Sequence, residues 1–250
     1  MAGQKAETSL VQHANPEFAV QPRWWVAESE VERAVRDLPK NGPWYMGYKD
    51  ITSPTNERTM IASFVPLSGV TNTFVLMPTH IAPLRQCCLL GNLNAFAYDF
   101  VTRQKIGGVH LNFFIVQQLP TLPPDTYEGK CPWSKKETLE HWISERVLKL
   151  SCTADDMLPL AKACAFKGSR GDGVHIWKEH DRANLRAQLD AGYFHLYGIG
   201  RDDAEYMLST FTATGFIKPD RRESDGAAWE HGSIGAAVLA AYDALAAHSK

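Results

Sequence analysis

The chain lacks most of the short patterns that identify an enzyme or a metal site. No GxSxG, HExxH, GxGxxG or P-loop pattern occurs in its 250 residues, so the sequence offers no nucleophile elbow, zinc-protease helix or phosphate-cradling glycine loop. Its five cysteines include no CxxC pair. We therefore expect reduced thiols, with neither a zinc site nor a disulfide framework.

Long hydrophobic runs are also missing. No apolar segment approaches the roughly 20 residues needed to cross a bilayer, and the first ten residues, MAGQKAETSL, lack the basic-then-apolar layout of a signal peptide. The composition, 44% hydrophobic and 22% charged, is that of an ordinary globular protein. We expect a cytoplasmic chain without a membrane partner, long enough for one large domain or two small ones.

A basic excess is the third absence, since the formal net charge is −2. Residues 1–124 hold ten Lys or Arg against nine Asp or Glu, whereas the remainder holds 16 against 19. Autonomous binding to nucleic acid usually needs a basic surface, because phosphate neutralisation supplies most of the non-specific affinity. Any DNA-binding face is therefore expected to be local, to lie in the first half, and to be assisted by another protein segment.

Hydrophobic periodicity predicts an α+β fold. Runs rich in β-branched and aromatic residues predict strands over 44–51, 59–65 and 73–77. The period then becomes helical, which predicts one core helix over 82–102. Helical patterns return in the second half, from Ser134 with its capping-box partner Glu137, from Thr153, after Arg201, and over 181–197 and 233–248. We expect a small mixed sheet packed around a central helix, followed by a helical half.

The chain divides by pattern into three segments. Residues 1–20 look like a flexible lead-in or junction, residues 21–124 like a mixed α/β unit, and residues 125–250 like a helical segment. Within the second segment, 23–27 and 113–116 are expected to be short strands, and their aromatic side chains are expected to be core anchors: Trp24, Trp25 and Phe113.

Two polar segments are the candidate functional sites. The first follows the predicted core helix and surrounds a Gly107-Gly108 turn, where the missing side chains let backbone approach a ligand closely. The second is the tip between two predicted strands. Their side chains can bond to base edges or phosphates, although water-facing loops are polar for many reasons. Arg58 could equally pair with Asp50 or Glu57. The candidate residues are Asn56, Arg58, Thr59, Arg103, Gln104, Lys105, Gly107, Gly108, His110 and Asn112.

Four stretches, 21–32, 48–66, 89–124 and 184–211, resemble the C-terminal region of large adenine-specific DNA methyltransferases, which include type IIG restriction–modification enzymes and phage-exclusion methyltransferases. The third stretch is the most specific, because it is long and ends in the Leu-Pro and Pro-Pro close of target-recognition domains. The resemblance implies a target-recognition domain over 21–124 and a helical segment after it. The cofactor S-adenosylmethionine is expected only in a missing catalytic domain, since this chain has no cofactor motif.

The resulting hypothesis is a non-catalytic DNA sequence-recognition domain of an N6-adenine DNA methyltransferase or restriction–modification enzyme, present as a C-terminal fragment or a split subunit. Its expected partners are double-stranded DNA and the methyltransferase catalytic domain. Arg58, Arg103 and Lys105 would hold phosphates or guanine edges, and Asn56, Gln104 and Asn112 suit adenine. The alternative is a protein-interaction module that docks a separate methyltransferase or restriction subunit through its acidic helical half.

Overall fold

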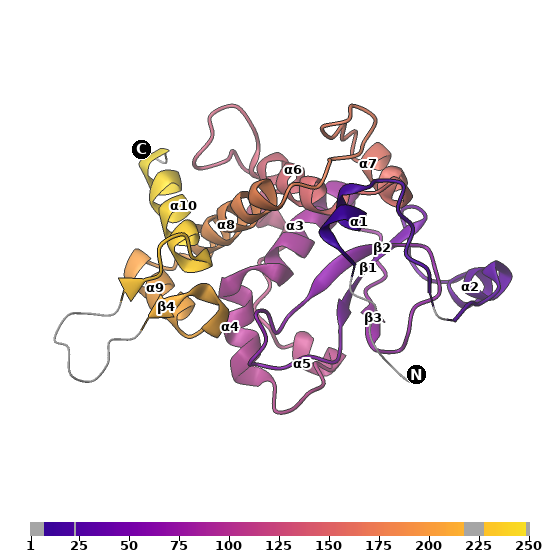
Figure 1. The fold of residues 1–250 in the computed structure, drawn as a ribbon, viewed down its shortest axis with the longest axis horizontal. Coiled ribbons are helices and arrows are strands. Elements are labelled where there is room, and N and C mark those ends of the chain that lie inside the picture. The colour runs from indigo at the N-terminus through magenta and orange to yellow at the C-terminus, as the bar shows by residue number, and fades with distance from the viewer. Residues whose placement is uncertain (1–7, 23, 218–227, 249–250) are drawn as a thin grey trace.

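The computed structural model describes residues 8–22, 24–217 and 228–248. A small antiparallel sheet lies beside a larger group of helices (Figure 1). The predicted α+β class is therefore confirmed. Within the described residues, no helix is both long and apolar enough to cross a membrane.

The sheet consists of three strands in the order β2-β1-β3, with β1 (Trp44–Lys49) between β2 (Ala62–Pro66) and β3 (Phe74–Leu76). Both pairings are antiparallel, with Tyr45 opposite Val65 and Tyr48 opposite Val75. All residues of β1 except Lys49 are buried, as expected for a central strand covered by helices. The predicted strands are confirmed, although each is shorter than its hydrophobic run.

The single helix predicted over 82–102 is wrong, because the chain forms two helices, α3 (Pro83–Asn94) and α4 (Phe96–Lys105). Ala95 between them is extended, with φ −73° and ψ 146°. Hydrogen bonds from residues distant in the sequence stabilise this break. The Asn94 side chain bonds to the backbone N–H and C=O of Ala62 at 3.0 Å, and Asp190 accepts the N–H of Phe96 at 2.8 Å. A helix direction can change where such partners satisfy the interrupted backbone groups.

The second half is helical as predicted. Its main helices are α6 (Leu139–Ser151), α8 (Glu179–Leu196), α9 (Arg201–Ser209) and α10 (Ile234–His248). Gly198 follows α8 with φ +67°, the left-handed conformation that ends many helices. The predicted start at Ser134 is wrong. Thr138 caps α6 by accepting the N–H of His141, whereas the Ser134 hydroxyl donates to Glu137.

Shorter elements complete the fold. α1 (Leu10–Ala14) and α2 (Glu28–Ala34) precede the sheet, α5 (Phe113–Val116) follows α4, and α7 (Leu158–Ala163) precedes α8. A two-residue pair, β4 (Phe216–Ile217) with β5 (Ala228–Trp229), leads into α10. Single 3₁₀ turns lie at Pro124–Tyr127, Asp155–Met157 and Thr212–Thr214.

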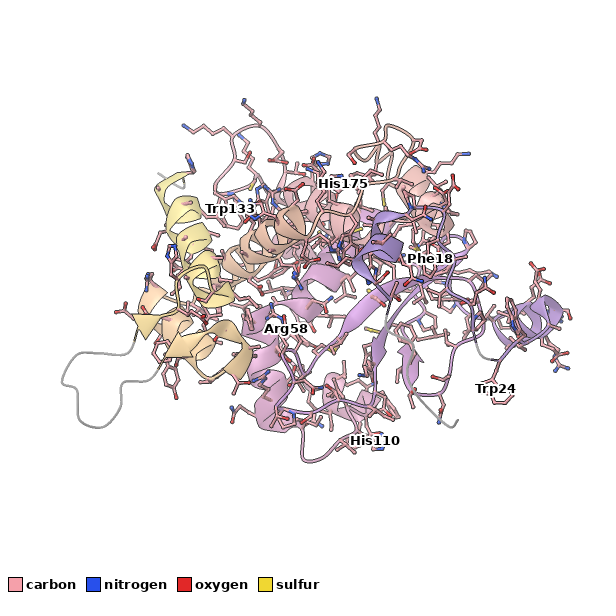
Figure 2. The ribbon with its side chains drawn as sticks, viewed as in Figure 1. Phe18, Trp24, Arg58, His110, Trp133 and His175 are labelled. Atoms are coloured by element: carbon pink, nitrogen blue, oxygen red, sulfur yellow. The ribbon has the colours of Figure 1, made fainter. Side chains whose placement is uncertain are left out.

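The two predicted strands at 23–27 and 113–116 are not found. Residues 24–27 are irregular and Arg23 lies outside the described residues, while 113–116 form the helical turn α5. Trp24, Trp25 and Phe113 are 79%, 76% and 63% exposed, so the prediction that they anchor the core is wrong. Aromatic residues favour strands only where another strand supplies hydrogen bonds and a packing surface, and none of the described strands does so here. Trp24 lies beside the outlying helix α2 (Figure 2).

The core crosses the boundary that the sequence suggests at residue 124. One buried cluster includes Met46 and Tyr48 of the sheet, Leu93 of α3, Trp142 of α6 and Tyr193 of α8. The hydroxyl of Tyr193 donates to the carbonyl of Cys88 at 2.6 Å. A second cluster joins α4 to α8, α9 and α10. The segments 21–124 and 125–250 therefore share their hydrophobic core, which fixes the α4 end relative to the helical half.

Candidate nucleic-acid interface

The loop over residues 106–112 is fastened to the chain that leaves strand β1. The N–H of Thr52 donates to the carbonyl of Val109 at 2.9 Å, and the N–H of Leu111 donates to the carbonyl of Asp50 at 2.8 Å. Ile106 and Leu111 are 8% and 0% exposed. These apolar anchors lie near either end of the loop, so the backbone between them is held at a fixed place while its polar residues face outward. His110 lies at the edge of the molecule in Figure 2.

The polar residues of this loop and of the α4 end form what we call the exposed loop: Gln104, Lys105, Gly107, Gly108, His110 and Asn112, all of them exposed. The side chains of Gln104, Lys105 and Asn112 make no hydrogen bond or ion pair with any other described residue. His110 differs, because its Nδ1 lies 2.8 Å from Oδ2 of Asp50. Gln104, Lys105 and Asn112 can therefore form hydrogen bonds with a ligand without breaking an internal contact.

The paired glycines of the exposed loop have no structural reason to be glycine. Neither Gly107 nor Gly108 has a positive φ, and a Cβ added at either position would meet nothing within 4 Å. Both L-alanine conformation and L-alanine volume are therefore compatible with the fold. What the glycines do provide is an uncovered stretch of backbone on the outer surface.

The second predicted segment, the tip over 55–59, belongs to a turn over 53–59 that is closed by hydrogen bonds from side chains. The Thr52 hydroxyl donates to the carbonyl of Thr59 at 2.7 Å, and the Thr59 hydroxyl donates to the carbonyl of Ser53 at 3.2 Å. The Asn56 amide donates to the Thr52 hydroxyl at 3.4 Å. Thr59 is completely buried. Asn56 and Thr59 thus hold the turn together instead of presenting their side chains to a duplex.

Arg58 enters the fold at the end of this turn. Its Nη2 donates to Oδ2 of Asp190 on α8 at 2.8 Å, and its guanidinium lies 3.1 Å from the centre of the Phe96 ring. The Arg58 side chain is 16% exposed and that of Asp190 is 4% exposed. The ring face attracts the cation and the carboxylate neutralises it. Arg58 therefore tethers the turn to the helical half.

Arg103 is also turned inward, although it stands beside the exposed Gln104. Its Nη2 donates to the carbonyls of Asn56 and of Glu57, the second at 3.2 Å. Its Nε lies 3.6 Å from Oδ2 of Asp99, and its guanidinium lies 3.8 Å from the Phe211 ring centre. The side chain is 9% exposed. The two predicted polar segments are thus brought side by side, through a contact in which Nη2 of Arg103 donates inside the protein.

Two arginines and two carboxylates form what we call the buried ion cluster, which consists of Arg58, Asp99, Arg103 and Asp190. Asp99 accepts the N–H of Thr59 at 2.9 Å and that of Met60 at 2.7 Å. Burial raises the pKa of Asp99 and that of Asp190, while backbone N–H groups and the neighbouring arginines lower both. Burial likewise lowers the pKa of Arg103, and Asp99 opposes that shift. Each cation therefore has a carboxylate counterpart, so neither arginine presents an unpaired charge to the phosphates of a duplex.

Two carboxylates in otherwise apolar patterns are a signal for this cluster in the sequence. Asp99 interrupts the apolar run that predicts the core helix, and Asp190 lies between the apolar Leu189 and Tyr193 on a helix of amphipathic pattern. A carboxylate at such a position needs a buried partner. Applied to Asp99 and Asp190, this rule predicts that nearby arginines such as Arg58 and Arg103 are buried as their partners.

Exposed apolar side chains surround the exposed loop. They are Ile51, Val109, Phe113 and Phe114, at 44%, 59%, 63% and 52% exposure. The two phenylalanine rings meet edge to face, with centroids 6.1 Å apart. Clustered exposed aromatics are typical of contact surfaces. This apolar rim was not predicted from the sequence, where Phe113 was assigned to the core.

One group of side chains has the composition of a cation site. Glu137, His141 and Glu145 follow each other at four-residue spacing, and their ligand atoms lie within 4.8 Å of one another. Two of the three already have partners, because Glu137 accepts from Ser134 and Glu145 pairs with Lys149 at 2.8 Å. These internal bonds would have to be given up on binding a metal ion.

Comparison with protein-family models, with curated proteins and with solved structures finds no match to this chain.

Proposed function

We propose that the chain is a non-catalytic DNA sequence-recognition segment of an N6-adenine DNA methyltransferase or restriction–modification enzyme, acting in the cytoplasm. The observation that carries the proposal is the exposed loop, a surface of uncommitted polar groups on a backbone anchored by Ile106 and Leu111. The resemblance of four stretches of the chain to the C-terminal region of such enzymes supports the same assignment.

The chemistry of the exposed loop suits base reading. Gln104 and Asn112 carry amides of the kind that bond to N6 and N7 of adenine, and Lys105 can contact phosphate or guanine. The uncovered backbone at Gly107 and Gly108 lets a phosphate or base edge come close. Compared with the sequence-based hypothesis, the interface loses Arg58, Thr59 and Arg103 to the interior and Asn56 to its turn.

This smaller interface makes the need for a partner stronger. With two arginines internally neutralised, Lys105 is left as the main cation of the exposed loop, and phosphate contacts supply much of the affinity for DNA. A methyltransferase catalytic domain that binds S-adenosylmethionine, in the same polypeptide or a separate subunit, would supply the remaining phosphate contacts and all of the chemistry.

Selection from a random-sequence duplex pool at low salt tests the proposal. We expect the parent chain to enrich a shared motif, and a variant with Gln104→Ala and Asn112→Ala to lose it or relax its adenine positions. Asn184→Ala removes an exposed amide on α8 and serves as the matched control. An unchanged motif with the double variant, or no enrichment by the parent, would contradict the proposal.

A second candidate function is a protein-interaction module that docks a separate methyltransferase or restriction subunit. The exposed rings of Phe113 and Phe114 favour it, because aromatic residues are enriched at protein interfaces. In this case, a variant with Phe113→Ser and Phe114→Ser loses a partner that co-purifies from the native cells, while duplex selection is unchanged. If DNA contact is the function, the order of sensitivity is reversed and the amide variant has the larger effect.

A further inference from the structure

A cleft separate from the exposed loop lies between strand β2 and helices α3, α6 and α8. Its volume is about 450 Å³, within the range of roughly 300–1,000 Å³ that is typical of small-molecule sites. Apolar side chains form much of its wall, among them Ile61 from the chain before β2, Leu90 from α3 and Leu150 from α6. Three arginines also line it: Arg58, Arg182 and Arg186. We call it the arginine cleft.

Arg182 is a half-buried cation without a carboxylate partner. Its Nη1 donates to the carbonyl of Leu150 at 2.8 Å, and its guanidinium lies 3.4 Å from the Trp177 ring centre. No described residue forms an ion pair with it, and the nearby Glu179 pairs with Arg186 instead, at 3.5 Å. Burial and the neighbouring Arg186 lower the pKa of Arg182 to about 10. Charges withdrawn from water normally have a counter-ion, and none of the described carboxylates pairs with Arg182.

Arg58 offers a second unfilled donor in the same cleft. Its Nη2 is bonded to Asp190, but its Nη1 is buried and has no acceptor among the described residues. Buried donors are satisfied in the great majority of proteins. The cleft is therefore lined by Arg182, which has no carboxylate partner among the described residues, and by Arg58, which has one guanidinium nitrogen without an acceptor.

We propose that the arginine cleft binds a phosphate monoester carried on a flat apolar body, the chemistry of a nucleotide. The planar donors of arginine match phosphate oxygens, and the apolar wall suits a ring. Glu57, which lines the cleft and is exposed, disfavours a longer polyphosphate by repulsion. The nucleotide could be free or could be a terminal residue of a nucleic acid, since both present the same group.

Isothermal titration of the full chain with adenosine monophosphate tests this inference, in a buffer without phosphate. We expect saturable binding, at least tenfold weaker in Arg182→Gln, as for loss of one charge-assisted hydrogen bond. Because Arg182 also contacts Leu150, Arg186→Gln at the exposed mouth provides a second variant that leaves that contact intact, and it too should weaken binding. Arg36→Gln, at an exposed arginine outside the cleft, is the matched control and should change nothing.

Further ligands separate the possible sources. Adenosine should bind poorly, and inorganic phosphate should compete. A 5′-phosphorylated single strand that displaces the monophosphate and binds more tightly supports the nucleic-acid source, whereas tighter binding of the free monophosphate supports a small-molecule ligand. The inference is overturned if none of the phosphates binds, or if Arg182→Gln and Arg186→Gln both bind like the parent. Lys105→Ala should leave the monophosphate affinity unchanged, so this outcome is independent of duplex recognition by the exposed loop.

Discussion

The turn over 53–59 and the exposed loop have similar polar compositions but differ in where their side chains are bonded. Both contain amide and basic side chains, and they lie against each other through Arg103. In the turn, Arg58 and Thr59 face carboxylates and carbonyls inside the protein. In the loop, Gln104, Lys105 and Asn112 have no partner among the described residues. Side-chain type alone therefore does not distinguish a polar residue that is bonded inside the protein from one that is free at the surface.

The difference comes from where counter-charges lie. Asp99 and Asp190 are placed by α4 and α8, and both are buried. A buried carboxylate is costly unless it is paired, so the nearest arginines are drawn toward it. Lys105 lies six residues beyond Asp99, on an exposed part of α4, and it forms no ion pair with a carboxylate of the described residues.

The largest loss of stability is expected on removing the ion pair between the turn and α8. We expect Asp190→Ala or Arg58→Ala to lower the free energy of unfolding by about 3–5 kcal/mol, since each leaves a buried charge without its partner. Urea denaturation measures the change. Arg33→Ala, which removes an exposed pair with Glu30 on α2, should have little effect.

A double-mutant cycle tests whether the two residues act together. The double variant Arg58→Ala with Asp190→Ala should lose much less stability than the sum of the single variants, because no unpaired charge is left behind. Strictly additive losses would show that Arg58 is not held by Asp190 and would reopen a surface role for it.

Arg103→Ala gives the next largest effect. We expect a loss of about 2–3 kcal/mol in the free energy of unfolding, since the guanidinium donates to the carbonyls of Asn56 and Glu57 and covers Phe211. Lys105→Ala on the same helix should be close to the parent in the same urea titration. Equal stability of the Arg103 and Lys105 variants would contradict the assignment of the two residues to different roles.

Substituting the glycines of the exposed loop should have a small effect on stability and a larger effect on duplex binding. Gly107→Ala and Gly108→Ala should change the free energy of unfolding by no more than about 1 kcal/mol, because the positions are open and have no positive φ. They should nevertheless weaken duplex binding, measured by fluorescence anisotropy.

Gly168→Ala is the contrasting control for stability. Its φ is +62°, and an added Cβ would lie 2.1 Å from the carbonyl oxygen of Val174, so it should be more destabilising than either loop variant. Strong destabilisation by Gly107→Ala would mean that the loop glycines serve the fold, and unchanged duplex binding would mean that the backbone there does not approach DNA.

Much of the fold could be predicted from local patterns. The strands around Tyr45, Phe64 and Val75 and the long helix α8 follow from hydrophobic periodicity. The break at Ala95 could not be predicted in this way. Its causes, Ala62 bonded to Asn94 and Asp190 bonded to Phe96, are far apart in the sequence. Such tertiary partners override local preference.

The candidate site was predicted in part. The exposed position of Lys105 and Asn112 follows from their place in a polar loop at a helix end. The inward turn of Arg103 does not, because it depends on Asp99 one helical turn earlier and on carbonyls of a turn that folds against it. The arginine cleft is formed by four elements from separate parts of the chain, so no local sequence motif predicts it.

The most direct test of the central claim is the salt dependence of duplex binding by the parent chain, Lys105→Ala and Lys162→Ala. Lys162 is an exposed lysine on α7, which lies at the upper edge of the molecule in Figure 1, whereas α5 lies at the lower edge. Fluorescence anisotropy at several salt concentrations gives the slope of log affinity against log salt. If the exposed loop contacts DNA, Lys105→Ala reduces the magnitude of that slope by about 0.9 and Lys162→Ala leaves it unchanged. Equal slopes for all three proteins, with both variants folded, would contradict the claim.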